Sequence, residues 1–494
     1  MTIRKDTPPP DDTLTPTPPP LTRRGWRPLI ARLHFYAGVL VAPFILVAAV
    51  TGGLYALAPT MERFVYADVL FVEPTGEPLP LSDQAAAARN AFPDLMMTGM
   101  RPPATGTEST RVYFGDPALD EEWSRAVFVD PYTGRVLGDE ATWLGYLPLS
   151  TWLDGLHRHL NLGEPGRIYS ELAASWLWVV ALGGLYLWLV KAAGERRRGR
   201  AGRVLSVDRS VSGRARTLNW HGTTGVWLLV GLLFLSATGI TWSTYAGAHV
   251  SDVRAALSWQ RPQLDTALAT SPASDEPPGG EHAGHGGTTP VDDARDPASI
   301  DYASIDYDAV LDAAAGAGVH VPLEVTLPTE AGQGIGVTEI DKPYRLTTNA
   351  ASIDPDHLTV AGEVDYWRDY SLVARLADWG IRAHMGLLFG LLNQLMLLGV
   401  AVGLVTVIVR GYRMWWQRRP TRGSDWAVGR PPVRGGVRRQ HPLAIAVLAV
   451  AAVGVGWFLP LLGLSLAAFV VADVIVAAIK RHRAFNERKA EVDA

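Results

Sequence analysis

The sequence predicts an α-helical integral membrane protein with a four-helix core formed by tandem duplication, a C-terminal helical hairpin, and two extracytoplasmic α+β modules. Three observations support this fold class. Long uncharged runs alternate with polar stretches in a 494-residue chain that is 48% hydrophobic and 19% charged. Basic residues collect at one end of each uncharged run. Two sets of motifs recur in the same order at matching spacings.

Four runs without Asp, Glu, Lys or Arg are long enough to cross about 30 Å of hydrocarbon as helices. They lie between Arg32 and Glu62, Glu171 and Lys191, Arg216 and Asp252, and Arg382 and Arg410. A further apolar region from Pro442 to Ile479 contains one charged residue, Asp473, and is divided near Pro460. This region is predicted to form a hairpin, which brings the number of helices to six.

Arg and Lys gather before the first run, after the second, after the fourth and after the hairpin. Because loops near span ends on the cytoplasmic side are enriched in these residues, both termini are predicted to be cytoplasmic. The long loops near 60–155 and 250–380 are rich in Asp and Glu, and we expect them on the opposite face. The expected location is the bacterial cytoplasmic (inner) membrane.

The predicted segments follow one another along the chain. They are a disordered Pro-rich tail (1–24), helix 1 (25–60), module 1 (61–150), an interfacial segment with helix 2 (151–192), a basic loop (193–216), helix 3 (217–248), module 2 (249–378) with a flexible insert (271–300), helix 4 (379–412), a second basic loop (413–440), the hairpin (441–480) and a cytoplasmic tail (481–494).

The repeated motifs indicate the duplication. An H-x3-G-x12-T-G pattern begins at His34 and again at His221, and a W-x4-H-x2-L-x2-G pattern begins at Trp152 and again at Trp379. A turn flanked by strand-like residues separates each pair, as VDPYTGRVLG at 129–138 and as IDPDHLTVAG at 353–362. Each copy holds two spans, so both have the same orientation and are expected to be related by a pseudo-two-fold axis along the membrane normal.

Composition excludes several kinds of chemistry. The chain has no Cys, which excludes disulfides, thiolate-held iron–sulfur clusters, a catalytic thiol and the C-x-x-C-H attachment of haem. A formal charge of −4 gives no indication of nucleic-acid binding. Any redox cofactor must therefore be held without cysteine sulfur.

Four histidines belong to the repeats: His34 and His221 open helices on the cytoplasmic side, and His157 and His384 open helices on the other side. Neutral imidazole is an axial iron ligand, so one pair near each face is what two b-type haems need. Gly38 and Gly225 follow one helical turn after His34 and His221, where a missing side chain lets a macrocycle approach. The alternative is that these histidines are polar anchors at the membrane interface.

The remaining histidines carry weaker signals. His159 is predicted to be an alternative outer ligand, or to lie behind the ligand or beside the substrate. His282 and His285, within EHAGHGG, are candidate ligands for copper or zinc. His249 is a weaker candidate still, and the others are expected at surfaces or turns.

These motifs resemble the PepSY-associated transmembrane proteins, in particular bacterial inner-membrane ferric-siderophore reductases. The resemblance covers roughly 25–415 and rests on RLHFYAG at 32–38, VDPYTGRVLG at 129–138, LHRHLNLGEPGR at 156–167, NWHGTTGVW at 219–227 and WGIRAHMGLLFGLLNQ at 379–394. It implies a four-helix membrane core, PepSY-like α+β modules outside and, in the reductase branch, haem held by histidines of the spans. The tail, the insert and the hairpin depart from the family pattern.

The resulting hypothesis is a di-haem reductase with His34 and His221 at an inner haem and His157 and His384 at an outer one. It would pass electrons to an extracytoplasmic metal acceptor, most simply ferric iron in a siderophore. The cytoplasmic loops are short and lack a Gly-rich phosphate motif, so the donor would be external, a quinol or a cytoplasmic reductase. Two alternatives remain open: a non-enzymatic PepSY membrane protein that regulates an extracytoplasmic protease or sensor, and a copper reductase that uses His282 and His285.

Overall fold

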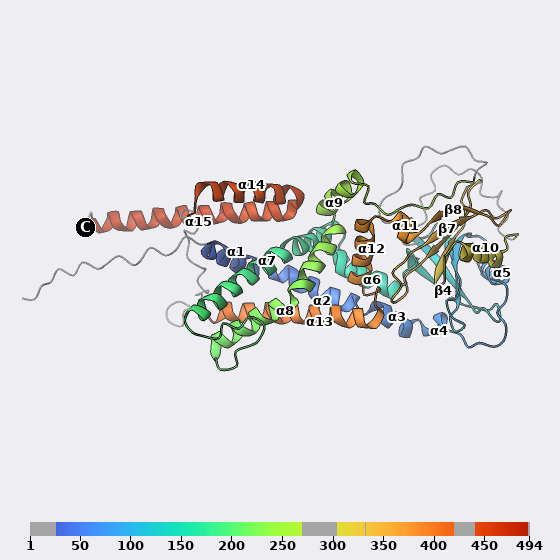
Figure 1. Ribbon diagram of the computed structural model, residues 1–494, viewed down its shortest axis with the longest axis horizontal. Helices are drawn as coiled ribbons and strands as arrows, with labels where there is room; N and C mark the ends of the chain where they lie inside the picture. Colours follow the sequence, from blue (N-terminus) through green and yellow to red (C-terminus); the bar gives the residue numbers. More distant parts are fainter. Residues whose placement is uncertain (1–25, 269–303, 331, 419–439, 493–494) are drawn as a thin grey trace, which may run out of the picture.

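The protein consists of a helical bundle with a β-sheet at one end (Figure 1). The computed structural model describes residues 26–268, 304–330, 332–418 and 440–492. The end of the bundle next to the sheet is called the sheet end below, and the opposite end is called the far end.

Within the described residues, four helices are long and apolar enough to cross a membrane: α7 (Glu164–Arg197), α8 (Gly213–Thr241), α13 (Gly390–Trp416), and the Pro460–Ile479 part of α15 (Pro460–Val492). A fifth span is made if α1 (Arg27–Leu40) and α2 (Ala42–Tyr55) are counted together. The last apolar helix, α14 (Pro442–Phe458), is shorter. The chain is therefore a multi-pass membrane protein, as the uncharged runs predict, although the first span is not the single helix expected over 25–60.

The break in the first span has a local cause. The axes of α1 and α2 differ by 58°, and Pro43 lies at the start of α2. Proline has no N–H to donate to the carbonyl four residues earlier, and its ring clashes with that carbonyl. The carbonyl oxygen of Val39 accepts a hydrogen bond from the Tyr412 hydroxyl instead, at 2.8 Å. The bend thus keeps its backbone paired in a region without water.

A single eight-stranded antiparallel sheet has the order β4-β3-β2-β1-β5-β6-β7-β8. Its first half contains β1 (Met96–Arg101), β2 (Thr110–Gly115), β3 (Trp123–Val129) and β4 (Val136–Trp143). Its second half contains β5 (Leu323–Thr326), β6 (Ile335–Glu339), β7 (Ala350–Ile353) and β8 (Val360–Val364). The two predicted modules are therefore joined, because β1 pairs with β5 at Gly99 with Thr326 and Met100 with Val325.

The repeated turns connect β3 to β4 and β7 to β8, as the strand-like flanks predict. On the sheet face away from the bundle lie α5 (Leu81–Ala91) and α10 (Tyr307–Gly316) (Figure 1). Their small apolar residues pack on both halves of the sheet in one core. That core includes Ala85, Val310, Met100, Val127 and Ile335, all fully buried.

Short helices connect the sheet to the bundle. They are α3 (Ala58–Val65), α4 (Ala67–Leu70), α6 (Pro148–His159), α9 (Tyr245–Ala256), α11 (Tyr366–Asp369) and α12 (Leu372–His384). His157 and His384 therefore lie in the last turns of α6 and α12 and do not open α7 and α13, which corrects the expectation from the sequence. Positive φ angles end α6 at Leu160 (54°) and follow α12 at Gly386 (82°), so the chain turns before the next helix begins.

Candidate functional site

The far-end pair consists of His34 on α1 and His221 on α8. Their ring centroids lie 6.3 Å apart with an interplanar angle of 81°. The Nδ1 of His34 lies 3.1 Å from the carbonyl oxygen of Val180 on α7, and the Nδ1 of His221 lies 2.9 Å from that of Val407 on α13. Four spanning segments thus meet at this pair.

The sheet-end pair consists of His157 on α6 and His384 on α12, also with ring centroids 6.3 Å apart. Here the Nδ1 atoms contact hydroxyls: Thr51 Oγ1 on α2 lies 3.0 Å from that of His157, and Thr238 Oγ1 on α8 lies 2.5 Å from that of His384. Each hydroxyl also donates to its own helix, Thr51 to Val47 at 2.9 Å and Thr238 to Phe234 at 2.8 Å.

These contacts determine the tautomer of the neutral imidazoles. A carbonyl oxygen only accepts, so Nδ1 of His34 and of His221 must be the donor. A threonine hydroxyl has one proton, and where it is donated to a backbone carbonyl the oxygen accepts from Nδ1. In all four rings the Nε2 lone pair is then available to a metal, and this is the arrangement in which a hydrogen bond to the other nitrogen orients a histidine ligand. All four of these contacts are made by Nδ1.

Burial also favours the neutral, metal-binding form of the imidazoles at the sheet-end pair, which lies outside the spanning helices. It lowers the pKa of His157 and of His384, because a charged imidazolium loses its hydration there. Both rings are therefore neutral at pH 7, the protonation state in which imidazole binds a metal.

Each of the four rings lies beside a glycine of a neighbouring helix. A Cβ built on Gly52 would lie 2.8 Å from Cε1 of His157, and one on Gly184 would lie 3.0 Å from Cε1 of His34. The same distance is 3.6 Å for Gly411 and His221, and 3.9 Å for Gly239 and His384. Since real Cβ contacts rarely fall below 3.4 Å, Gly52 and Gly184 leave space that the imidazoles occupy.

Each pair has the ring separation that two imidazole ligands of one haem iron would have. Two imidazoles on one metal, each bound through nitrogen at about 2.0 Å, have ring centroids about 6 Å apart. Both pairs match this separation. A Cβ built on Gly38 or on Gly225 meets no atom within 4 Å, so space is open beside the far-end pair. The described part of the chain has no group of three or more His, Asp or Glu that could hold a bare metal ion, whereas haem iron would need only two protein ligands.

A cavity of about 90 Å³ opens beside the sheet-end pair, between bundle and sheet. Among its lining residues are Tyr55, Tyr146, Asp154, Arg158 and Trp242. The Tyr55 ring stacks on His157 at 6.4 Å and 12°, and Trp242 lies 5.8 Å from His384. Asp154 and Arg158 form an ion pair at 3.4 Å. Aromatic rings thus separate the cavity from the imidazoles, and its lining includes one negatively charged and one positively charged side chain.

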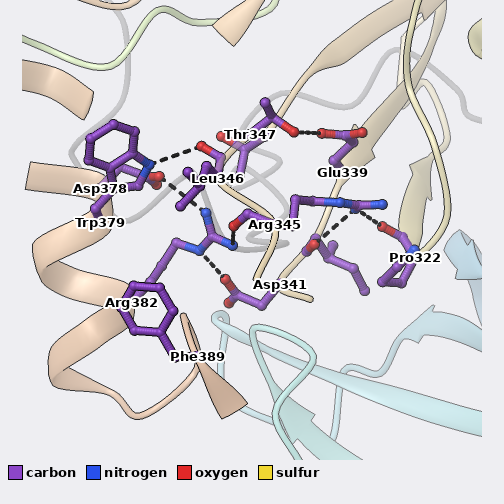
Figure 2. A network of polar contacts seen from close by, with 12 residues as sticks. Pro322, Glu339, Asp341, Arg345, Leu346, Thr347, Asp378, Trp379, Arg382 and Phe389 are labelled. Carbon is purple, nitrogen blue, oxygen red and sulfur yellow. Dashed lines mark hydrogen bonds and ion pairs between the residues drawn. The ribbon is translucent and has the colours of Figure 1, made fainter. Parts of the chain in front are cut away.

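A buried polar network fastens α12 to the sheet (Figure 2). The guanidinium of Arg382, with its side chain 1% exposed, donates to Asp341 at 2.7 Å and to the Arg345 carbonyl at 2.7 Å. It also contacts Asp378 at 3.4 Å. Asn393 of α13 donates to the Ala383 carbonyl at 2.8 Å. His384 is therefore carried by a helix that is fixed on both sides.

The other histidines lie outside the two pairs. The buried Nδ1 of His159 has no hydrogen-bond partner among the described residues, and it is His157 that lies opposite His384. His249 donates through Nδ1 to the Phe458 carbonyl at 3.0 Å. His282 and His285 lie outside the described residues.

Several residues of the site escaped sequence reasoning. Thr51 and Thr238 belong to the repeated motif, but the sequence assigns them no role. A Thr-Gly pair within an apolar helix does not indicate which side chain packs against it. The carbonyls of Val180 and Val407 are backbone groups. A V-x3-G spacing to Gly184 and Gly411 recurs in the two halves and could have identified them.

Comparison with protein families gives one match: the family described as PepSY-associated TM region, over residues 31–418. The matched region contains both histidine pairs and all eight strands, and it ends before α14. No curated protein matches the chain.

Proposed function

The chain belongs to the PepSY-associated transmembrane family, and from this membership we propose that it is a membrane reductase that holds two b-type haems and passes electrons to a metal acceptor at the sheet end. The observation that carries the proposal is the equal 6.3 Å separation of the two histidine pairs. Haem bound at each pair would supply a one-electron carrier whose iron needs no open coordination site.

We further propose that the two halves arose by tandem duplication. The contacts of the two halves support this: Thr51 with His157 corresponds to Thr238 with His384, and His34 with Val180 corresponds to His221 with Val407. The order of the sheet is also symmetrical about the β1–β5 junction. Each pair then combines one histidine from each half.

In this proposal His34 and His221 hold the haem nearer the donor, and His157 and His384 hold the haem nearer the acceptor. The sheet end would face the outside of a bacterial cytoplasmic membrane. A potential that is negative inside then assists outward electron flow by about 2.3 kcal/mol per charge per 100 mV for full transit. The donor would be a quinol or a cytoplasmic reductase.

The acceptor would bind at the cavity beside the sheet-end pair. Tyr55 and Trp242 separate this cavity from the imidazoles, so an acceptor there lies close to the electron source without ligating it. Transfer of one electron converts ferric to ferrous iron. Siderophore oxygens are hard ligands that hold ferrous iron less tightly, so reduction would release the metal.

The test begins with the visible spectrum of the purified, full-length protein. We expect a Soret band, which weakens in His34→Ala and in His384→Ala but not in His357→Ala, a histidine with a 75% exposed side chain. A protein without a Soret band, or one whose band is the same in all three variants, would refute the haem proposal and favour the regulatory alternative.

The acceptor is tested separately by following reoxidation of the dithionite-reduced protein. We expect rapid reoxidation by a ferric siderophore. Reoxidation by Cu(II) but not by the siderophore would instead indicate a copper reductase. Deletion of 281–287 then tests whether the HAGHGG segment takes part.

A further inference from the structure

The C-terminal hairpin lies beyond the region shared with the family, which ends at residue 418. Its second helix, α15, carries a carboxylate, Asp473, within the apolar run Pro460–Ile479. An ionisable side chain inside a membrane-spanning segment is costly and is kept only with a partner or a role. Asp473 forms an ion pair with Arg32 of α1.

One stripe of α15 faces the core. Ser465, Phe469 and Asp473 follow one another at intervals of four residues, which places them on the same side of the helix. Ser465 accepts a hydrogen bond from Nε1 of Trp176 on α7 at 2.8 Å, and the ring of Phe469 lies 4.8 Å from that of Tyr36 on α1. The stripe therefore runs antiparallel to α1, with Phe469 at Tyr36 and Asp473 at Arg32.

The bend of the hairpin is fastened at a second place. Leu459 and Leu462 are 6% and 4% exposed within the core of the bundle. His249 of α9 stacks on Trp457 at 4.8 Å and donates to the Phe458 carbonyl. The docking of the hairpin thus does not depend on the ion pair alone.

Helix α1 lies between the hairpin and the far-end pair. Arg32 and Tyr36 contact α15, whereas His34, between them in sequence, contacts α7 and His221. The Arg32 side chain is 9% exposed, and its guanidinium carries a positive charge. Without a counter-charge, a positive charge would act on the far-end pair through a medium of low dielectric constant.

We infer that the hairpin tunes the far-end pair electrostatically: Asp473 neutralises Arg32 and thereby lowers the reduction potential of the haem held by His34 and His221. This inference rests on the proposed function. A lower potential at the donor side, relative to the sheet-end haem, favours electron flow toward the sheet. The hairpin would then contribute to the direction of transfer without contacting either ligand.

The expected shifts have opposite signs. Asp473→Asn removes a negative charge beside Arg32 and should raise the potential, changing the ratio of reduced to oxidised haem by up to about tenfold, or 59 mV for one electron. Arg32→Gln removes a positive charge next to the far-end pair, so its shift should be downward. The double variant should return close to the wild-type potential, and Asp473→Glu should retain it.

The measurement is a spectroscopic redox titration in a His157→Ala/His384→Ala background, in which only the far-end haem remains. Glu195→Gln is the matched control, since Glu195 is a carboxylate on α7 paired with Lys191 at 2.6 Å and its side chain is 29% exposed, compared with 28% for Asp473. No shift is expected in this control.

The outcomes separate the two proposals. Absence of a Soret band from every variant would refute the proposed function. A normal Soret band with an unchanged potential in Asp473→Asn, or shifts of the same sign in both single variants, would overturn the inference while leaving the haem proposal intact.

Docking of the hairpin has a readout that needs no haem. Because the chain lacks cysteine, Tyr36→Cys combined with Phe469→Cys creates the only thiol pair, which should cross-link with a short bifunctional maleimide. The control is Tyr36→Cys with Val471→Cys, since Val471 is 57% exposed on another side of α15. Equal cross-linking of the two pairs would contradict the docking on which the inference depends.

Discussion

The far-end pair and the sheet-end pair have the same ring separation but different supports. At the far end the rings lie on bundle helices α1 and α8 and bond to the carbonyls of Val180 and Val407. At the sheet end they lie on short helices outside the spans and bond to the side chains of Thr51 and Thr238. The sheet-end pair adjoins a cavity between bundle and sheet, and His384 lies on a helix fastened to the sheet.

The two histidine pairs therefore differ in how their rings are held. A backbone carbonyl of a spanning helix cannot be altered by substitution and moves only with its helix, so the far-end pair is a fixed element. The threonine hydroxyls can be removed by single substitutions, and the short helices that carry the sheet-end rings move with the sheet to which they are fastened. Single substitutions can therefore remove the hydrogen-bond partners of the sheet-end rings, whereas the backbone partners of the far-end rings cannot be removed in this way.

The largest expected effect comes from removing one pair at a time. His157→Ala/His384→Ala and His34→Ala/His221→Ala should each remove about half of the Soret absorbance, since each pair would hold one of two haems. With the physiological donor, the first variant should still become reduced, whereas the second should not, because electrons enter at the far end. Donor reduction in both variants would show that the pairs do not act in series.

Arg382→Gln should have the next largest effect, and only at the sheet end. It leaves the carboxylates of Asp341 and Asp378 without their buried cation, which costs about 3–5 kcal/mol for a buried pair. Thermal unfolding in detergent should show this loss, together with a lower haem content at the sheet end. Arg368→Gln is the control, since Arg368 is an exposed arginine paired with Asp369 at 2.8 Å, and it should leave thermal unfolding nearly unchanged.

The glycine contacts predict a graded series within each pair. Alanine at Gly52 or Gly184 must displace an imidazole, with built distances of 2.8 and 3.0 Å, whereas alanine at Gly411 or Gly239, at 3.6 and 3.9 Å, fits with little movement. Soret absorbance per mole of protein should fall most in Gly52→Ala and least in Gly239→Ala. An effect that follows helix propensity, equal at all four positions, would argue against contact with the rings.

The smallest effect is expected from the hydroxyls. Thr51→Val and Thr238→Val keep the shape of the side chain but remove the acceptor for Nδ1, at a cost of about 1 kcal/mol each, or about fivefold in haem affinity. Haem transfer to apomyoglobin measures this loss. Thr406→Val is the control, since Thr406 donates to the Val402 carbonyl at 2.8 Å and lies on an exposed face. A loss as large in the control would assign the effect to the helices and not to the histidines.

Sequence patterns predict the local features of this fold well. Uncharged runs mark the spanning helices, and the repeated Asp-Pro turns mark the hairpins β3–β4 and β7–β8. The histidines also come together in the expected combinations, because equal spacing in two halves predicts equal positions. The ligand role of these histidines stays a prediction.

Long-range features could not be read from the chain. Pairing of β1 with β5 joins residues more than 220 positions apart, such as Met100 and Val325, and no local pattern specifies it. In the sequence, Arg382 is only the charged residue at the boundary of an apolar run. In the structure its side chain is almost fully buried against partners from the sheet. The bend at Val41 follows from Pro43, but the direction of the bend depends on what packs around it.

The junction between β1 and β5 has a consequence for biosynthesis. When the first half has been made, β1 has a partner in β2 on one side only, and its other edge exposes unpaired amide and carbonyl groups. That edge is covered only after two further spanning helices, α7 and α8, have been synthesised and β5 has reached the same side of the membrane. Slow or interrupted translation between residues 101 and 323 should therefore leave an aggregation-prone nascent intermediate. We expect this intermediate to depend on chaperones on the side of the membrane where the sheet lies.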